Sequence, residues 1–336
     1  MFGITSVAVA GANGHTGRFV MEALEAAGVA AMPLTRSAVY LARNGAQRTA
    51  RSLEIDRPEA LDAVLSGADA LINCAGPFLD TAEPLARAAL RAGIPYLDVS
   101  AEQHTTRRLF EELSGPAEKT GAIVAPAMAF YGGLADLLAS AVIGAGEPVD
   151  DIRIAVGLDS WQPTRGTVET GRRNTYERLM VRSGGLTPVG SPPPSRDWRF
   201  PPPIGLQPVV GVALSEMILL TRHTAARSIT SFMNLKPLED LRSPDAQPPE
   251  PVDGKGRSAQ QFVLEVEADA GGETRRASAA GQDIYAVSAA MVVQACLDIG
   301  LLRGKVAGVR APGELFDARR FLQRLAPEIR VSFDRR

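Results

Sequence analysis

A glycine-rich segment near the start of the chain has the residue types and spacing of a phosphate-binding turn. The segment GANGHTG occupies residues 11–17, follows the apolar run 6–10, and precedes a stretch whose apolar residues have helical spacing. In such a strand–turn–helix unit the glycines allow a tight turn, a close approach of the phosphates and close packing of helix on strand. The sequence therefore predicts a dinucleotide site, and the alternative is a turn that only connects strand to helix. The cofactor-binding residues predicted here are Gly11, Asn13, Gly14, His15, Thr16 and Gly17.

The end of the second apolar run indicates which dinucleotide is bound. Arg36 and Ser37 follow this run, and no Asp or Glu occurs between Glu25 and Glu54. An NAD site usually has an acidic residue here, which accepts a hydrogen bond from the ribose 2′-hydroxyl. The planar guanidinium of Arg36 instead suits a 2′-phosphate, and Ser37 adds a hydroxyl donor. These residues favour NADP(H), and the alternative is that Arg36 is a solvated loop arginine.

Length and composition are typical of a globular protein with two domains. The chain has 336 residues, of which 45% are hydrophobic and 22% charged, and a formal net charge of −2 without a basic run, which argues against nucleic-acid binding. We expect no membrane span, because no apolar stretch approaches about 18 residues, and no signal peptide, because the first residues lead directly into a strand. Two cysteines and three isolated histidines give no disulfide framework and no metal-ligand spacing. A cytoplasmic protein without a metal is expected.

The first part of the chain alternates strand-like apolar runs with helical patterns. This alternation predicts an α/β fold with a Rossmann-type doubly wound parallel sheet, in which ligands bind at the carboxyl ends of the strands. One helix, within 104–119, is expected to be interrupted near Gly115 and Pro116. The loops that follow the later strands are expected to surround the nicotinamide. The cofactor-binding residues predicted on these loops are Cys74, Ala75, Gly76, Pro77, Phe78, Ser100 and Glu102.

The pattern changes near residue 150 to that of a second, α+β domain on a mainly antiparallel sheet. Residues 261–280 alternate apolar and polar positions around two glycines, which predicts a hairpin with one buried face. The proline-rich tract 191–203 is expected to be a long loop, and 167–182 a polar helix or lid. The predicted domains are 1–145 plus 281–336 for dinucleotide binding, and 146–280 for substrate binding and dimerisation.

Several segments together resemble a known family. The glycine turn, NCAGPF at 73–78, YLDVSAE at 96–102 and GQDIY at 281–285 resemble the saccharopine dehydrogenase-like NAD(P)-dependent oxidoreductases, which include saccharopine reductases and trans-acting enoyl reductases. GVRAPGELF at 308–316 is similar to the C-terminal segment of short bacterial members. The resemblance implies a split nucleotide domain, a mixed-sheet substrate domain, NADP(H), and reduction of C=N or polarised C=C bonds. It does not extend over 160–255 and does not fix the substrate.

Five residues are candidates for further roles, each with a structural alternative. Tyr131, next to two glycines, is a candidate proton donor, or else an aromatic wall. Arg165 suits bidentate binding of a substrate carboxylate or phosphate, or else is a surface arginine. Glu102 is expected to bind the nicotinamide ribose or a substrate amine, or to be a helix N-terminal carboxylate. Cys74 is expected to be a small buried thiol and Asp136 a structural cap.

These observations predict an NADPH-dependent reductase that acts on a C=N or polarised C=C bond of a small, anionic substrate. Tyr131 and Arg165 are its candidate catalytic residues. We expect a homodimer, formed through the sheet of the second domain, because the hairpin at 261–280 has an apolar face and an unassigned edge. The alternatives are a non-catalytic NADP(H)-sensing module and a structural subunit of a biosynthetic complex.

Overall fold

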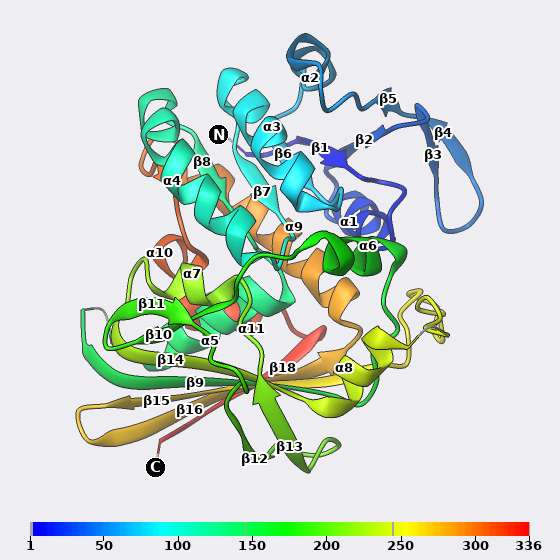
Figure 1. Ribbon diagram of the computed structural model, residues 1–336. Helices are drawn as coiled ribbons and strands as arrows, with labels where there is room; N and C mark the ends of the chain where they lie inside the picture. Colours follow the sequence, from blue (N-terminus) through cyan, green and yellow to red (C-terminus); the bar gives the residue numbers. More distant parts are fainter. Residues whose placement is uncertain (1–2, 145, 244, 336) are drawn as a thin grey trace. The chain divides into compact units, whose positions relative to one another are not determined.

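The computed structural model describes residues 3–144, 146–243 and 245–335, and it divides into two compact units (Figure 1). Unit 1 contains residues up to 129, together with 169–174 and 288–310, and unit 2 contains the remainder. Helices α6 (Arg165–Arg173) and α9 (Ile284–Leu302) therefore have residues in both units.

The segments 130–144 and 311–335 belong to unit 2, although the sequence analysis assigned them to the dinucleotide-binding domain. The first of them forms elements that pack on the sheet of unit 2, and the second contributes a strand to that sheet. The compact units are therefore divided at residues that differ from the expected domain boundaries.

A sheet of seven strands forms the centre of unit 1, in the order β17-β8-β7-β6-β1-β2-β5. Each neighbouring pair in it is parallel, which confirms the predicted Rossmann-type sheet. Its strands are β1 (Ser6–Ala10), β2 (Ala30–Thr35), β5 (Arg51–Ser52), β6 (Ala70–Asn73), β7 (Tyr96–Asp98), β8 (Ile123–Ala125) and β17 (Gly308–Val309). The helices of the unit are α1 (His15–Ala26), α2 (Pro58–Val64), α3 (Phe78–Arg91) and α4 (Gln103–Thr120), and β3 (Val39–Leu41) and β4 (Gln47–Thr49) form a separate hairpin.

Helix α4 corrects one expectation about unit 1. The predicted interruption near Gly115 and Pro116 is wrong, because α4 continues through both residues to Thr120 and is followed by the C-cap residue Gly121, which has a φ of 71°. Proline removes one N–H donor from a helix, but Leu113 and Ala117 on either side of it are fully buried. Burial of this apolar face outweighs the local preference of the glycine–proline pair.

The sheet of unit 2 has nine strands and is mainly antiparallel, as predicted. Its main path is β11-β10-β14-β9-β15-β16-β18, and β14 and β9 are the parallel neighbours. Off this path, β13 pairs with β14, and β12 pairs with β13. The strands are β9 (Pro148–Leu158), β10 (Leu179–Arg182), β11 (Gly185–Pro188), β12 (Ser195–Arg199), β13 (Leu206–Gly211), β14 (Ala225–Asn234), β15 (Gln261–Ala270), β16 (Glu273–Gln282) and β18 (Ile329–Arg335). The helices are the π-helix η1 (Phe130–Leu134), α5 (Ala135–Val142), α7 (Glu216–Leu220), α8 (Leu235–Arg242), α10 (Pro312–Leu315) and α11 (Ala318–Arg324).

The hairpin predicted at 261–280 is formed by β15 and β16. Phe262, Leu264 and Val266 on one face of β15 are fully buried, and helix α5 packs against both strands. The outer edge of β16 pairs with β18. The apolar face and the edge that suggested a dimer surface are thus occupied within unit 2, and the homodimer stays a prediction.

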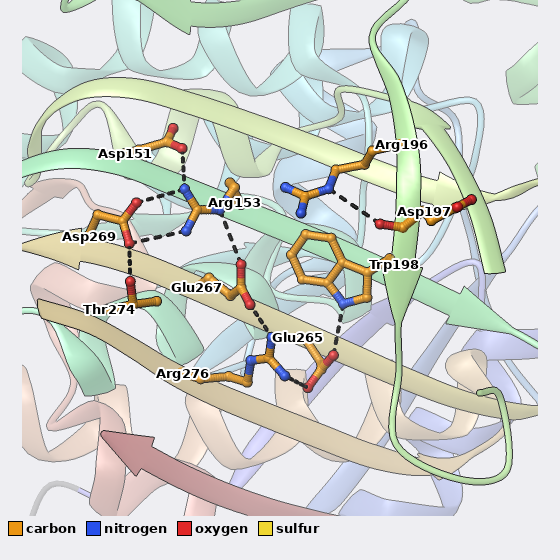
Figure 2. Close-up of polar contacts among 10 residues, drawn as sticks. All are labelled: Asp151, Arg153, Arg196, Asp197, Trp198, Glu265, Glu267, Asp269, Thr274 and Arg276. Atoms are coloured by element: carbon orange, nitrogen blue, oxygen red, sulfur yellow. Dashed lines mark hydrogen bonds and ion pairs between the residues drawn. The ribbon is translucent and has the colours of Figure 1, made fainter. Parts of the chain in front are cut away.

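The opposite face of these strands carries an ion-pair network, which Figure 2 shows. Arg153 on β9 pairs with Asp151 at 2.6 Å, with Asp269 at 2.7 Å and with Glu267 at 3.1 Å. Arg276 on β16 pairs with Glu267 as well. Hydrogen bonds that Arg153 donates to the carboxylates raise its pKa, and the largest contribution is from Asp269. The carboxylates neutralise both guanidinium groups and leave this half-buried network with a net negative charge.

The proline-rich tract is an ordered hairpin and not the long loop that was expected. Strand β12 pairs with β13, and β13 pairs with β14. Trp198, Phe200 and Ile204 pack in one apolar cluster on the sheet, and Trp198 Nε1 donates a 2.8 Å hydrogen bond to Glu265 Oε2 (Figure 2). Prolines concentrate before β12 and in the turn after it, where no ladder N–H is required.

Two further expectations are corrected by helices α6 and α9. The polar segment 167–182 is only partly helical, since α6 ends at Arg173 and β10 begins at Leu179. The expectation that no apolar stretch approaches the length of a membrane span is wrong for α9, whose 19 residues are long and apolar enough by length and composition. Its most apolar window is 61% buried, as in the core helix of a soluble protein, so its length is weak evidence for a membrane span.

Candidate functional site

The glycine turn of unit 1 has the geometry that its sequence predicts. Gly11 has a φ of 75°, and a Cβ on it would lie 2.8 Å from the main chain of Ala75. A Cβ on Gly17 would lie 2.2 Å from the carbonyl oxygen of Gly11, and one on Gly14 would lie 3.0 Å from the same atom. A side chain at any of these positions would displace main-chain atoms. The turn is therefore a cradle that only glycine permits.

Asn13 fixes the outer side of this turn. Its Nδ2 donates to the carbonyl of Val39 at 2.7 Å, and its Oδ1 accepts from the N–H of Leu41 at 2.8 Å. Both contacts join the turn to the β3–β4 hairpin, so the Asn13 side chain positions the turn. His15 and Thr16 are the first two residues of α1 and are half-buried.

Arg36 and Ser37 directly follow β2, beside the turn, where Gly11 N donates to Leu34 O at 3.1 Å. The Arg36 side chain is exposed and makes no ion pair with the residues that the structure describes. The hydroxyl of Ser37 donates to the carbonyl of Val39 at 3.3 Å. The guanidinium is thus unpaired at the position where a 2′-phosphate would be recognised.

The loop after β6 lies against the glycine turn. Cys74 N donates to Ala10 O at 2.8 Å, and Ala75 N donates to Asn73 Oδ1 at 2.9 Å. The predicted residues of this loop from Cys74 to Phe78 are half-buried or exposed. Burial of the sulfur raises the pKa of the Cys74 thiol, which supports a protonated thiol rather than a nucleophile.

A buried polar network fixes the ends of β6 and β7. Asp98 Oδ1 accepts hydrogen bonds from the N–H groups of Ala127 at 2.8 Å and of Ser100 at 3.0 Å, and Oδ2 accepts one from the Tyr96 hydroxyl at 3.0 Å. Tyr96 in turn accepts from Asn73 Nδ2 at 3.1 Å. Burial raises the pKa of Asp98. The side chains of Asn73, Tyr96 and Asp98 therefore hold the loops that follow these strands in place.

Ser100 and Glu102 differ in the hydrogen bonds that their side chains make. Glu102 is 2% exposed, and its carboxylate accepts from Phe78 N at 3.1 Å and from the Thr105 hydroxyl at 2.8 Å. Glu102 is the N-cap residue of α4 but makes no side-chain capping hydrogen bond there, and its carboxylate fixes the start of α3. Burial raises its pKa. The hydroxyl of Ser100 is buried without a hydrogen-bond partner among the described residues.

The two catalytic candidates belong to unit 2. Tyr131 lies in η1, and its hydroxyl is buried without a hydrogen-bond partner among the residues described. Arg165 is the first residue of α6, and its side chain is exposed. The geometry of unit 2 alone leaves both alternatives for Arg165 open.

Asp136 has a larger role than the cap that was expected. It is fully buried, and its Oδ1 lies 2.7 Å from His223 Nε2, while Oδ2 accepts from Gly313 N at 2.6 Å. The attraction of Asp136 outweighs burial and raises the pKa of His223. Sequence reasoning missed His223, which is distant in the chain from Asp136.

Sequence reasoning also missed Glu216. Glu216 is 2% exposed, and burial raises the pKa of its carboxyl to about 7. A signal was present, because Glu216 lies in an otherwise apolar run from 212 to 220 that a serine alone interrupts. A carboxylate in such a run is a candidate for a shifted pKa.

Comparison with known families identifies the turn-bearing part of unit 1. Residues 7–124 match the family model described as the saccharopine dehydrogenase NADP binding domain. These residues are similar to that NADP-binding domain. The cofactor predicted from Arg36 agrees with this family, and the resemblance expected from the sequence is confirmed.

Relatives of the saccharopine dehydrogenase group are similar to this chain over different lengths. A probable mitochondrial saccharopine dehydrogenase-like oxidoreductase of Arabidopsis thaliana is 27% identical over 145 residues, which are 38% of this chain and 32% of that protein. The chain thus matches about a third of that relative's length. Saccharopine dehydrogenase (L-Glu forming) of Saccharomyces cerevisiae has a similar fold, with a TM-score of 0.64, 15% identity, and coverage of 98% of this chain and 100% of that one. An engineered D-amino acid dehydrogenase bound to NADP⁺ gives a TM-score of 0.50 and 12% identity, with 97% of each chain covered.

Proposed function

We propose that the chain is an NADPH-dependent oxidoreductase that reduces a C=N or polarised C=C bond of a small substrate. The observation that carries this proposal is the glycine cradle, because a Cβ on Gly17 would overlap Gly11 O within an NADP-binding domain. The names of the similar proteins support oxidoreductase chemistry. A non-catalytic NADP(H)-sensing module and a structural subunit are the competing functions.

The residues of unit 1 fit a dinucleotide. The cradle leaves main-chain atoms of Gly11, Gly14 and Gly17 free of side chains, Arg36 is an unpaired cation, and the buried Ser100 hydroxyl lacks a partner among the described residues. In the proposal the main-chain atoms of the cradle bind the pyrophosphate, and Arg36 binds the 2′-phosphate. The bound cofactor supplies hydride, and the chain's own residues bind, orient and move a proton.

In this proposal Tyr131 supplies the proton that completes the reduction. Its pKa is raised well above the usual value, first by burial and then by the Tyr285 hydroxyl and Glu216, so its hydroxyl stays protonated at neutral pH. An unpaired O–H within a protein is available to an incoming polar group. The aromatic rings of Phe130 at 5.0 Å and Trp161 at 5.9 Å pack against its ring and limit water.

Arg36→Ala is expected to weaken NADPH binding by about 10–100-fold and to leave NADH binding nearly unchanged. Each hydrogen bond to a charged group contributes about 1.5–3 kcal/mol, and the 2′-phosphate distinguishes the two cofactors. Fluorescence titration of both reduced cofactors measures the effect. Arg57→Ala is the control, since Arg57 is an exposed arginine paired with Glu54. Equal affinities of the unchanged protein for NADPH and NADH would contradict the assignment.

Arg165→Ala is expected to raise KM for an anionic substrate about 10-fold or more and to leave NADPH affinity intact, because a charge-assisted clamp is lost. NADPH oxidation is first measured with imines formed from oxo acids and amines, and with enoyl thioesters. KM is then compared with that of Arg172→Ala, an exposed arginine paired with Glu169 on the same helix. An unchanged KM would mean that Arg165 is a surface arginine that does not bind the substrate. If none of the imines and enoyl thioesters were reduced, the non-catalytic NADP(H)-sensing module would be favoured.

A further inference from the structure

Two packed elements of unit 2 carry buried polar atoms that the proposed function has not fully used. Tyr131 Oη on η1, and Ser215 Oγ and Glu216 Oε2 at the start of α7, are buried without hydrogen-bond partners among the described residues. Helix α7 packs against η1. Buried polar atoms are nearly always paired, so a group of unpaired ones requires an explanation. A π-helical turn such as η1 frequently occurs at functional sites.

The environment of Tyr131 is apolar on the ring and polar at the hydroxyl. Trp161, which packs on the ring, donates from Nε1 to Tyr285 Oη at 3.1 Å, and Tyr285 also contacts the Thr167 hydroxyl at 3.0 Å. Tyr285 is therefore engaged by its own neighbours. Glu216 is the carboxyl group whose charge acts on Tyr131. Removing the proton from Tyr131 next to an ionised Glu216 would place two negative charges in a buried site.

The charged groups around Glu216 leave it able to hold a proton. Its Oε1 accepts from Leu214 N at 3.0 Å. The Ser231 side chain and the positive charge of Arg178, which donates to Ala213 O at 3.0 Å, also favour the carboxylate. Burial acts in the opposite direction and prevails, which raises the pKa to about 7. On the packed helix α5, Asp136 is already bound to His223 and to the N–H of Gly313. Glu216 thus changes its protonation near neutral pH.

We propose that Glu216 is a positioning residue that keeps Tyr131 protonated and replaces the proton that Tyr131 gives up. This inference rests on the proposed function. The Tyr131 O–H bond breaks, and its proton forms an N–H or C–H bond on the substrate atom that receives the electron pair of the reduced double bond. The Glu216 carboxyl then returns a proton to the tyrosinate, and the carboxylate takes one from solvent. One proton is consumed per turnover, and the electrons come from the hydride of NADPH.

Trp161 is a built-in reporter for the test. The chain has two tryptophans, so Trp198→Phe leaves Trp161, which packs on Tyr131, as the sole one. In this variant the fluorescence is expected to titrate with a midpoint of about 7, matching Glu216. Adding Glu216→Gln is expected to abolish the titration, and adding Glu216→Asp to preserve it. Adding His223→Asn, the control for a neighbouring titrating group, is expected to leave it unchanged.

Coupling of the two side chains is tested by adding Tyr131→Phe, which keeps the ring and removes the hydroxyl. The midpoint is expected to rise, because replacing the buried Tyr131 hydroxyl by hydrogen makes the surroundings of the Glu216 carboxylate less polar and disfavours its charged form. The inference would be overturned if His223→Asn removed or shifted the titration, or if Tyr131→Phe left its midpoint unchanged. NADPH titration of the same variants tests the proposed function separately, since failure to bind NADPH contradicts that function and leaves the Glu216 titration measurable.

A second measurement avoids Trp198→Phe, which removes a buried hydrogen bond. The pKa of Glu216 is raised from 4.5 to about 7 in the folded protein, so its contribution to stability is fully present below pH 4.5 and lost as pH rises through about 7. Urea unfolding of the unchanged protein and of Glu216→Gln at several pH values is expected to show this difference. An identical pH dependence of the two proteins would overturn the inference. With a substrate found above, Glu216→Gln should lower kcat on the order of 100-fold, and Glu216→Asp should restore part of it.

Discussion

Gly17→Ala is expected to abolish measurable NADPH binding and to destabilise unit 1. The new Cβ would lie 2.2 Å from Gly11 O, a main-chain atom that cannot move without opening the turn. Overpacking of this kind costs about 1–3 kcal/mol in a well-packed core. The cradle would lose its shape as well, so we expect affinity to fall more than about 100-fold, which corresponds to about 2.7 kcal/mol. NADPH fluorescence titration and thermal unfolding measure the two effects.

Gly115→Ala is the matched control for this prediction. Gly115 lies inside α4, and nothing lies within 4 Å of a Cβ placed on it. Alanine is the better helix former by up to about 1 kcal/mol, so the control is expected to bind NADPH normally and to be as stable or more stable. If Gly17→Ala bound NADPH as well as Gly115→Ala does, residues 11–17 would not be the pyrophosphate site.

Asp98→Ala is expected to reduce the free energy of unfolding by about 3 kcal/mol or more. The change leaves the N–H groups of Ala127 and Ser100 without their acceptor, and it removes the acceptor of the Tyr96 hydroxyl. An unsatisfied buried donor costs about 1–3 kcal/mol. NADPH affinity should fall too, because these donors lie in the loops that follow β7 and β8. Urea unfolding measures the stability.

Asp62→Ala is the corresponding surface control. Asp62 accepts a bidentate pair from Arg91, and the two side chains are 45% and 43% exposed. Exposed pairs contribute about 0–1 kcal/mol, so this variant should unfold close to the unchanged protein. If Asp98→Ala reduced the free energy of unfolding no more than Asp62→Ala does, the buried network would not hold these loops.

The local sequence was sufficient for the dinucleotide-binding part of the fold. The glycine turn, the following helix and the parallel strands depend on spacing and on contacts with chain neighbours, so periodicity and the glycine positions predict them. The β15–β16 hairpin was predicted as well, but with one buried face, whereas Val263 and Glu265 on its second face are also buried. Arg36 followed from its place directly after β2 and from the absence of acidic residues there.

Contacts between residues distant in the chain decided what the sequence left open or predicted wrongly. The proline-rich tract became a hairpin because Trp198 and Phe200 could be buried on Val263, a gain that local turn preferences do not report. The Glu102 carboxylate fixes the start of α3, because the N–H of Phe78, 24 residues away, donates to it. In each case the partner is set by the folded sheet.

The residues proposed for cofactor binding and catalysis show most clearly which properties follow from the sequence and which follow from the tertiary structure. The sequence by itself predicted the phosphate cradle, because such a cradle is built from consecutive main-chain groups whose geometry glycine controls. Only the tertiary structure revealed that Glu216 and the Tyr131 hydroxyl are buried on packed elements, and that Asp136 is paired with His223. Burial and charge pairing set the protonation of such groups, and both depend on neighbours that are remote in the chain.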